Sequence, residues 1–150
     1  MATDYTRLRE HLVAQFSCDP ASVHGPAHWK RVEFHGLLIA PTNSAIVEVI
    51  RLFALFHDCR RIHDGYDDGH GARGAEYASQ LRDKYFELPD DEFELLHNAC
   101  TWHAHGRLSD DPTIGACWDA DRLDLGRVGM RPLPDYMSTP KGRELAGENT

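Results

Sequence analysis

The sequence predicts an all-α fold, in which a single domain of 150 residues forms a bundle of five to seven helices. Apolar residues recur at intervals of three and four along successive segments, which is the periodicity of amphipathic helices. No stretch shows the sustained alternation of apolar and polar residues that a half-buried strand would have. With 41% hydrophobic residues, no internal repeat and no linker, the chain is long enough to bury one core of its own.

Six segments have the spacing or the end residues of helices, and they cover about residues 4–16, 26–40, 44–58, 72–86, 89–103 and 112–126. In the first of them, Leu8, Leu12 and Phe16 share one face. Pro26 suits the first position of the second helix, and Pro41 is expected to end that helix at residue 40.

The third predicted helix is expected to lie at the centre of the bundle, because ten of its fifteen residues are apolar. A polar, glycine-rich loop follows over residues 60–71. Ala75, Ala78 and Leu81 give the fourth helix an apolar face, and prolines open the fifth and sixth. After the sixth helix the chain is dotted with prolines, and residues 140–150 are expected to form a flexible tail.

The charge and the apolar runs of the chain exclude several kinds of partner. There are 16 basic and 24 acidic residues, which gives a net charge of −8 that would repel a nucleic-acid polymer. No run of apolar residues is long enough to span a bilayer, and no secretory signal is visible, so we expect no membrane partner and a cytoplasmic location. The four cysteines are widely spaced and form no C-x-x-C pair, which is typical of reduced thiols.

Two adjacent residues, His57 and Asp58, end the predicted central helix. Burying an imidazole beside a carboxylate is costly unless another group pairs with the charge. One interpretation is a hydrogen bond between the two side chains at the helix end, and the other is a cation that both of them bind. A second pair, His63 and Asp64, falls in the polar loop, so we do not expect it to supply the main ligands.

Two further residues favour the cation. His28 lies on the apolar stripe of the second helix, and Asp121 has the spacing of the apolar residues of the sixth. A carboxylate that faces the core needs a cation or several hydrogen-bond donors. A salt bridge to Arg31 would also satisfy Asp121, and Asp124 is a rival for its role.

These residues occur in the order H…HD…D, which resembles the HD-domain superfamily of metal-dependent phosphohydrolases. The matching segments are H-W-K-R-V at 28–32, F-A-L-F-H-D at 53–58 and D-A-D-R-L-D at 119–124, and the resemblance covers about residues 24–128. Proteins of this superfamily are helical bundles whose metal is held by the first His, the His-Asp pair and the late Asp. The resemblance therefore implies four metal ligands: His28, His57, Asp58 and Asp121.

The binuclear branch of this superfamily has two more histidines between the His-Asp pair and the late Asp. His70 and His103 match them, so the resemblance implies a second metal, with Asp58 as the catalytic residue that bridges both ions. His105 competes with His103 for this role, and with a single metal His70 would only cap a helix. Imidazole and carboxylate ligands without a thiolate suit one or two divalent ions of Mn, Fe, Co, Ni or Zn.

The resemblance implies an enzyme that cleaves a small phosphate ester, for which a nucleotide is one candidate. A bound divalent ion lowers the pKa of its water from about 15.7 to about 7, which supplies hydroxide at neutral pH. Arg31, Arg61 and Arg73 are expected to bind the phosphate, although each alone could be an ordinary surface arginine. Two alternatives are an HD-type di-iron oxygenase and a non-catalytic nucleotide-binding module.

Overall fold

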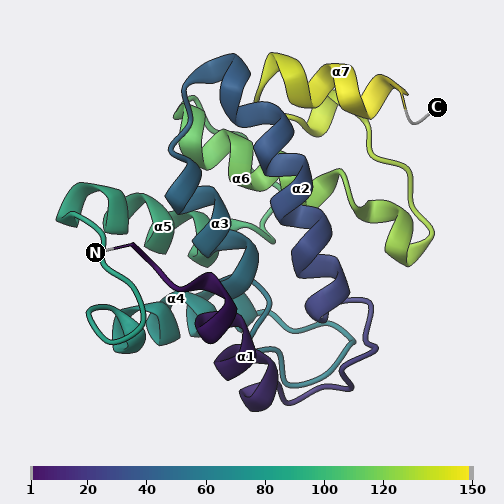
Figure 1. Cartoon of the computed structure of the whole chain (residues 1–150). Coiled ribbons are helices and arrows are strands. Elements are labelled where there is room, and N and C mark those ends of the chain that lie inside the picture. The colour runs from purple at the N-terminus through teal and green to yellow at the C-terminus, as the bar shows by residue number, and fades with distance from the viewer. Residues whose placement is uncertain (1, 149–150) are drawn as a thin grey trace.

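The computed structural model describes residues 2–148, and all of the regular secondary structure in this part is helical (Figure 1). Seven α-helices lie in it: α1 (Tyr5–Gln15), α2 (Pro26–Asn43), α3 (Val47–Phe56), α4 (His70–Leu81), α5 (Asp90–Trp102), α6 (Pro112–Arg122) and α7 (Pro140–Glu148). Two short 3-10 helices, η1 (Leu125–Val128) and η2 (Pro134–Tyr136), separate α6 from α7. The described residues contain no strand, so the predicted all-α fold is confirmed.

The helix α3 forms the centre of the bundle, as its apolar composition predicts. Seven of its ten residues are buried, and the rings of Phe53 and Phe56 are fully enclosed. α2, α5 and α6 pack around it, and α4 lies against its carboxyl-terminal end (Figure 1). Leu8 and Leu12 of α1 are also fully buried and belong to the same core. The carboxyl-terminal end of α3 is therefore enclosed by neighbouring helices.

The prediction that α2 ends at residue 40 is wrong, because the helix continues through Pro41 to Asn43. Pro41 lies in the last turn, where its missing N–H removes only one hydrogen bond of the helix. The helix ends at Ser44, which has a left-handed conformation with φ of 62° and donates its N–H to the carbonyl oxygen of Ala40.

The prediction of a flexible tail is wrong for residues 140–148, which form α7, whereas residues 149–150 lie outside the described part of the chain. Asp119 of α6 fixes the segment before α7. Its carboxylate accepts hydrogen bonds from the backbone N–H groups of Ser138 at 2.7 Å and Thr139 at 2.8 Å. Contacts of this kind between distant segments leave no periodic pattern in the sequence.

Two glycines allow α4 to approach its neighbours closely. A Cβ atom at Gly74 would collide with the carbonyl oxygen of Phe56, and one at Gly71 would collide with that of Cys100. Because α4 begins at His70, this close approach brings its first residue next to the ends of α3 and α5.

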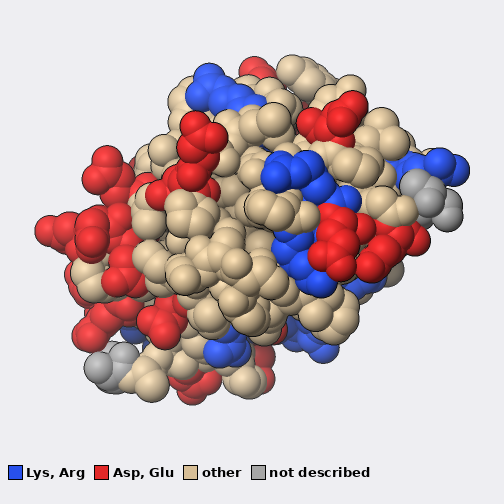
Figure 2. Space-filling model, turned by 90° about the horizontal axis from the view of Figure 1, so that it is seen from above, with Lys and Arg blue, Asp and Glu red and all other residues tan. Residues whose placement is uncertain are grey.

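No helix among the described residues is long and apolar enough to span a membrane. Figure 2 shows one face of the molecule, on which acidic side chains gather along one edge. Lysine and arginine side chains form smaller groups elsewhere on this face, some of them directly beside acidic side chains. The surface of this acidic chain therefore includes locally basic areas.

Candidate metal centre

The six side chains that the sequence singles out as ligands lie together in the fold. They form two groups that share Asp58: His28, His57, Asp58 and Asp121 in one, and Asp58, His70 and His103 in the other. Within each group the possible ligand atoms lie within 4.8 Å of one another. No cysteine among the described residues joins either group.

Helix ends position all six of these residues. His28 lies in the first turn of α2, His57 and Asp58 follow α3 directly, His70 is the first residue of α4, and His103 follows α5 directly. Asp121 comes from the last turn of α6. The ends of separate helices therefore supply all of the ligands.

The two oxygens of Asp58 face different pairs of histidines. Its Oδ2 lies 3.3 Å from Nε2 of His28 and 3.4 Å from Nε2 of His57. Its Oδ1 lies 3.1 Å from Nε2 of His70 and 3.4 Å from Nε2 of His103. A carboxylate with one oxygen toward each pair has the arrangement needed to bridge two cations.

The carboxylate of Asp121 lies beside only one of the two histidine pairs. Oδ1 of Asp121 lies 3.1 Å from Nε2 of His28 and 3.3 Å from Nε2 of His57. The first pair therefore has two carboxylates beside it, whereas the second pair has one.

All four histidines turn the ring nitrogen Nε2 toward Asp58. The other nitrogen, Nδ1, donates to backbone carbonyl oxygens in three of the rings. In His57 the acceptors are Phe53 and Ala54, both at 3.0 Å. In His70 the acceptor is Asp67 at 2.5 Å, and in His103 it is Cys100 at 2.7 Å. Nδ1 of His28 donates to the carboxylate of Asp124 at 2.7 Å. A carbonyl or carboxylate oxygen only accepts, so each Nδ1 carries a hydrogen and Nε2 of each neutral ring presents a lone pair.

The Nε2 atoms of each histidine pair face one another at short distances. The Nε2 atoms of His28 and His57 are 3.1 Å apart, and those of His70 and His103 are 3.0 Å apart. The four rings are at most 4% exposed, so water does not screen the repulsion between the lone pairs and the Asp58 carboxylate. A cation in each group would relieve this repulsion, and the imidazole and carboxylate donors fit a divalent transition metal.

The protonation states of the ligands also favour a cation at the centre. Burial disfavours a charge on His28, but hydrogen bonds with Asp121 and Asp124 outweigh burial and raise the pKa of His28 to about 10. Burial also disfavours ionisation of Asp58, yet the charge of His57 and the facing imidazoles hold the pKa of Asp58 well below its usual value. Hydrogen bonds with His28 and His57 do the same for Asp121 against the effect of burial. Both carboxylates are therefore ionised, and a proton on His28 offsets one of their two negative charges when no metal is bound.

The rivals named from the sequence lie outside the two groups. Asp124 bonds the far nitrogen of His28 and receives Arg31 Nε at 2.8 Å, so the expected salt bridge of Arg31 forms with Asp124 and not with Asp121. His105 is exposed and packs against Trp102. Asp124 is nevertheless positioned to orient His28, as carboxylates behind metal-bound histidines commonly do.

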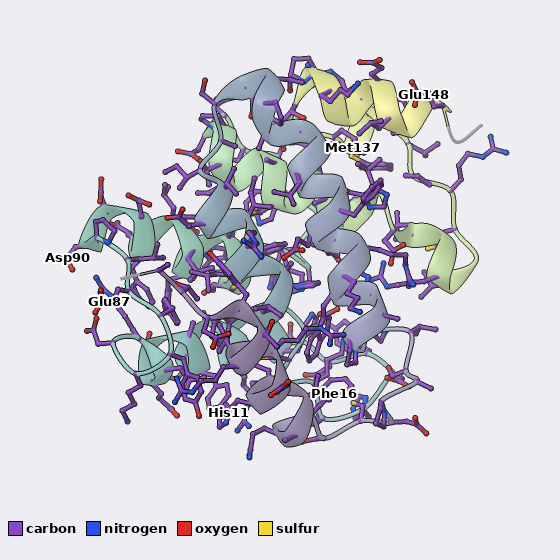
Figure 3. The ribbon with its side chains drawn as sticks, viewed as in Figure 1. His11, Phe16, Glu87, Asp90, Met137 and Glu148 are labelled. Atoms are coloured by element: carbon purple, nitrogen blue, oxygen red, sulfur yellow. The ribbon has the colours of Figure 1, made fainter. Side chains whose placement is uncertain are left out.

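Two other histidines also lie away from the centre. His63 is exposed in the loop after α3. His11 of α1, labelled in Figure 3, hydrogen-bonds the hydroxyl of Tyr77 through Nε2 at 2.8 Å.

The three arginines expected to bind phosphate have different positions. Arg61 is at the centre, with Nε 3.7 Å from Oδ1 of Asp58, and this buried Nε has no hydrogen-bond partner. Arg31 is connected to the centre through Asp124. Arg73 donates to the carboxylate of Asp67 at 2.5 Å, which keeps it away from the two groups.

Two residues outside the six candidate ligands also lie near the centre, and the sequence reasoning missed the first of them, Arg127. Arg127 has a terminal nitrogen 3.7 Å from Oδ1 of Asp121, but it follows α6 in a turn without periodicity. His24 has Nδ1 3.8 Å from Oδ2 of Asp58, and burial lowers the pKa of His24 to about 4 although Asp58 opposes this.

A cavity of about 260 Å³ leads to the second group. The residues around it come from the loop after α3, the start of α4 and the segment after α5: Arg61, Gly65, Tyr66, Asp67, Asp68, His70, Ala104 and His105. Its lining includes one candidate ligand and the arginine beside Asp58, so a small molecule could reach the centre from this side.

Comparison with known proteins gives a likeness in fold. No protein-family model matches the chain, and no curated protein matches it significantly. Among solved structures, the chain is similar to a predicted HD superfamily hydrolase from an uncultured Thermotogales bacterium, with a TM-score of 0.75 and 25% sequence identity. The match covers 97% of this chain and 84% of the other.

Proposed function

Because the chain has the HD-domain fold and gathers six possible ligands around Asp58, we propose that it is a metal-dependent phosphohydrolase that acts on a small phosphate ester. The likeness to an HD superfamily hydrolase supports a hydrolase in general. The phosphate ester, with a nucleotide as one candidate, follows from the resemblance of the sequence motifs and from the cationic groups near the centre.

The ligands divide between two proposed metal positions. His28, His57 and Asp121 would hold one divalent ion, His70 and His103 would hold the other, and Asp58 would bind both. Bound divalent ions would supply hydroxide at neutral pH and would neutralise charge on the phosphate. Asp124 and the backbone carbonyls hold the rings so that Nε2 points inward.

One observation supports the proposal more than any other: two pairs of histidine Nε2 atoms converge on the two different oxygens of one buried carboxylate. A single hydrogen-bonded His-Asp pair does not need four imidazoles around one carboxylate. Here every Nδ1–H is already used elsewhere.

Arg61 is the residue best suited to hold a phosphate oxygen at the centre. Its guanidinium lies beside Asp58, lines the cavity that leads to His70, and has an unused N–H. Hydrogen bonds between an arginine and a phosphate are charge-assisted and directional, so Arg61 would fix the ester for attack.

The metal content tests the first part of the proposal. Protein purified without added metal, or reconstituted with Mn, Co or Ni, should contain one to two equivalents per chain by elemental analysis. Asp58→Ala should reduce this to near zero, because it removes a ligand of both groups, while circular dichroism shows the helices intact. His63→Ala is the matched control and should keep its metal, since His63 lies in the exposed loop. Absence of metal from reconstituted protein would overturn the proposal.

A screen for phosphate release tests the second part. Nucleotides and other phosphate esters are incubated with protein loaded with Mn, Co, Ni or Mg, and at least one ester should release phosphate in a reaction that Asp58→Ala abolishes. No release from any ester, together with iron-dependent oxygen consumption, would contradict the phosphohydrolase and favour the di-iron oxygenase.

A further inference from the structure

A second cleft, of about 640 Å³, lies between α2 and the segment that follows α6. None of the six candidate metal ligands lines it. Its walls include three arginines, Arg31, Arg127 and Arg131, and one acidic residue, Asp124. This is an unusual concentration of positive charge for a chain whose net charge is −8.

The arginines of this cleft have hydrogen-bonding capacity to spare. Arg31 bonds Asp124 only through Nε, so both of its terminal nitrogens have no partner among the described residues. Arg131 is exposed and forms no hydrogen bond or ion pair within this part of the chain. The side chain of Arg127 is only 10% exposed, yet its buried Nε has no hydrogen-bond partner. A buried guanidinium N–H without an acceptor is costly, and a bound anion would remove that cost.

Asp124 does not cancel the positive charge of the cleft. One oxygen of its carboxylate binds Arg31, and the other binds Nδ1 of His28 at 2.7 Å. Arg131 is thus left without a carboxylate partner among the described residues, and Arg127 has only that of Asp121, at 3.7 Å.

We propose that this cleft binds a phosphate group, held by Arg31, Arg127 and Arg131. Guanidinium groups match the oxygens of a phosphate with paired, charge-assisted hydrogen bonds, and three of them can surround a tetrahedral dianion. The phosphate is either a free ion or a second phosphate of a larger molecule whose ester group lies at the metal centre. The binding itself does not depend on the proposed hydrolysis.

The cleft is connected to the metal centre through its own arginines. A terminal nitrogen of Arg127 lies 3.7 Å from Oδ1 of Asp121, and Arg31 shares Asp124 with His28. A phosphate that draws these guanidinium groups toward itself would weaken their hold on the carboxylates of the centre.

Calorimetric titration of inorganic phosphate into metal-free protein tests the proposal without any catalytic readout. The wild type should show one saturable site. Arg131→Ala should weaken binding about tenfold or more, the effect of losing a charged hydrogen-bonding partner. Because Arg131 is exposed and has no partner within the described residues, this variant should fold normally.

Lys30→Ala is the matched control. Lys30 is an exposed cation of α2, next to Arg31, and it does not line the cleft. It should change the phosphate affinity less than twofold. Absence of saturable binding would overturn the proposal. So would an Arg131→Ala variant that binds like the wild type, because the phosphate would then lie elsewhere, for example at Arg61. An equal loss in Lys30→Ala would also overturn it, because it would indicate only a general electrostatic effect.

The source of the phosphate is distinguished with the metal-loaded protein. If it belongs to the substrate, Arg131→Ala should raise KM for a nucleoside diphosphate and leave KM for the monophosphate unchanged. If it is a free ion, added inorganic phosphate should change the rate for the monophosphate in the wild type but not in Arg131→Ala. Either result supports a phosphate in the cleft, whereas no effect of Arg131→Ala in either assay opposes it. If no hydrolysis is found at all, the calorimetric result still stands on its own.

Discussion

At the scale of single residues, the centre has a protonation state that depends on what occupies it. The carboxylates of Asp58 and Asp121 are buried and ionised, so they need positive charge nearby. In metal-free protein that charge is the proton on His28, whose pKa is raised to about 10. A metal ion would need the same Nε2 atom in its unprotonated form, so a proton and a metal compete for it.

This competition predicts how the stability of metal-free protein depends on pH. The pKa of His28 is higher in the folded protein than its ordinary value of 6.5, so its contribution to stability is complete below about 6.5. The contribution is lost as the pH rises through about 10. Urea unfolding of chelator-treated protein should therefore give a lower free energy of unfolding at pH 9.5 than at pH 7.

Two variants show whether His28 is responsible. His28→Gln should flatten the pH dependence above about pH 7, whereas His97→Gln, which changes a histidine outside both groups, should leave it unchanged. A free energy of unfolding that does not fall between pH 7 and pH 9.5 in the wild type would contradict the interpretation.

At the scale of helices, the centre depends on how closely their ends approach. His70 can face His103 only because Gly71 lies against the backbone of α5, and Gly74 lies against the end of α3. A bulkier residue at either position would force α4 outward. The second pair of histidines is therefore more sensitive to helix packing than the first.

Gly71→Ala should reduce metal binding at the second position and destabilise the fold by about 1–3 kcal/mol, the usual cost of overpacking. Metal content and chemical unfolding measure the two effects. Gly147→Ala is the control, because a Cβ at this helical glycine of α7 meets no atom of the described residues within 4 Å. If Gly71→Ala kept the full metal content and the stability of the control, the close approach would not be needed.

The position of α7 depends on Asp119 in a similar way. Asp119→Ala removes the acceptor of the Ser138 and Thr139 N–H groups, so it should cost about 2–6 kcal/mol, since each unsatisfied buried donor costs about 1–3 kcal/mol. Hydrogen exchange should accelerate in α7 before it does in α3. A uniform acceleration over all helices would indicate global unfolding and would contradict this local role.

At the scale of the whole molecule, the sequence contains most of the fold and the proposed ligands because both depend on local patterns. The apolar composition around Phe53 marks the central helix, and the adjacent His57 and Asp58 mark its end. Contacts between distant segments explain what was missed. Arg127 lies in a turn without periodicity, and residues 140–148 are ordered by Asp119 from another helix.

Metal binding should stabilise the whole molecule, because the ligands come from α2, α4 and α6 and from residues that follow α3 and α5. A ligand at a concentration one hundred times its Kd adds about 2.7 kcal/mol. For a protein of this size that corresponds to a rise in Tm of about 5–11 °C. Thermal unfolding with and without Mn or Co should show this rise in the wild type and none in Asp58→Ala, and an equal rise in both would point to binding elsewhere.

The anchoring of the four imidazole rings has a consequence for how this protein tolerates change in evolution. Three rings are held by main-chain carbonyl groups, which every amino acid possesses, and only His28 relies on a side chain, that of Asp124. The residues that supply these carbonyl groups can therefore be replaced without changing the orientation of those three rings.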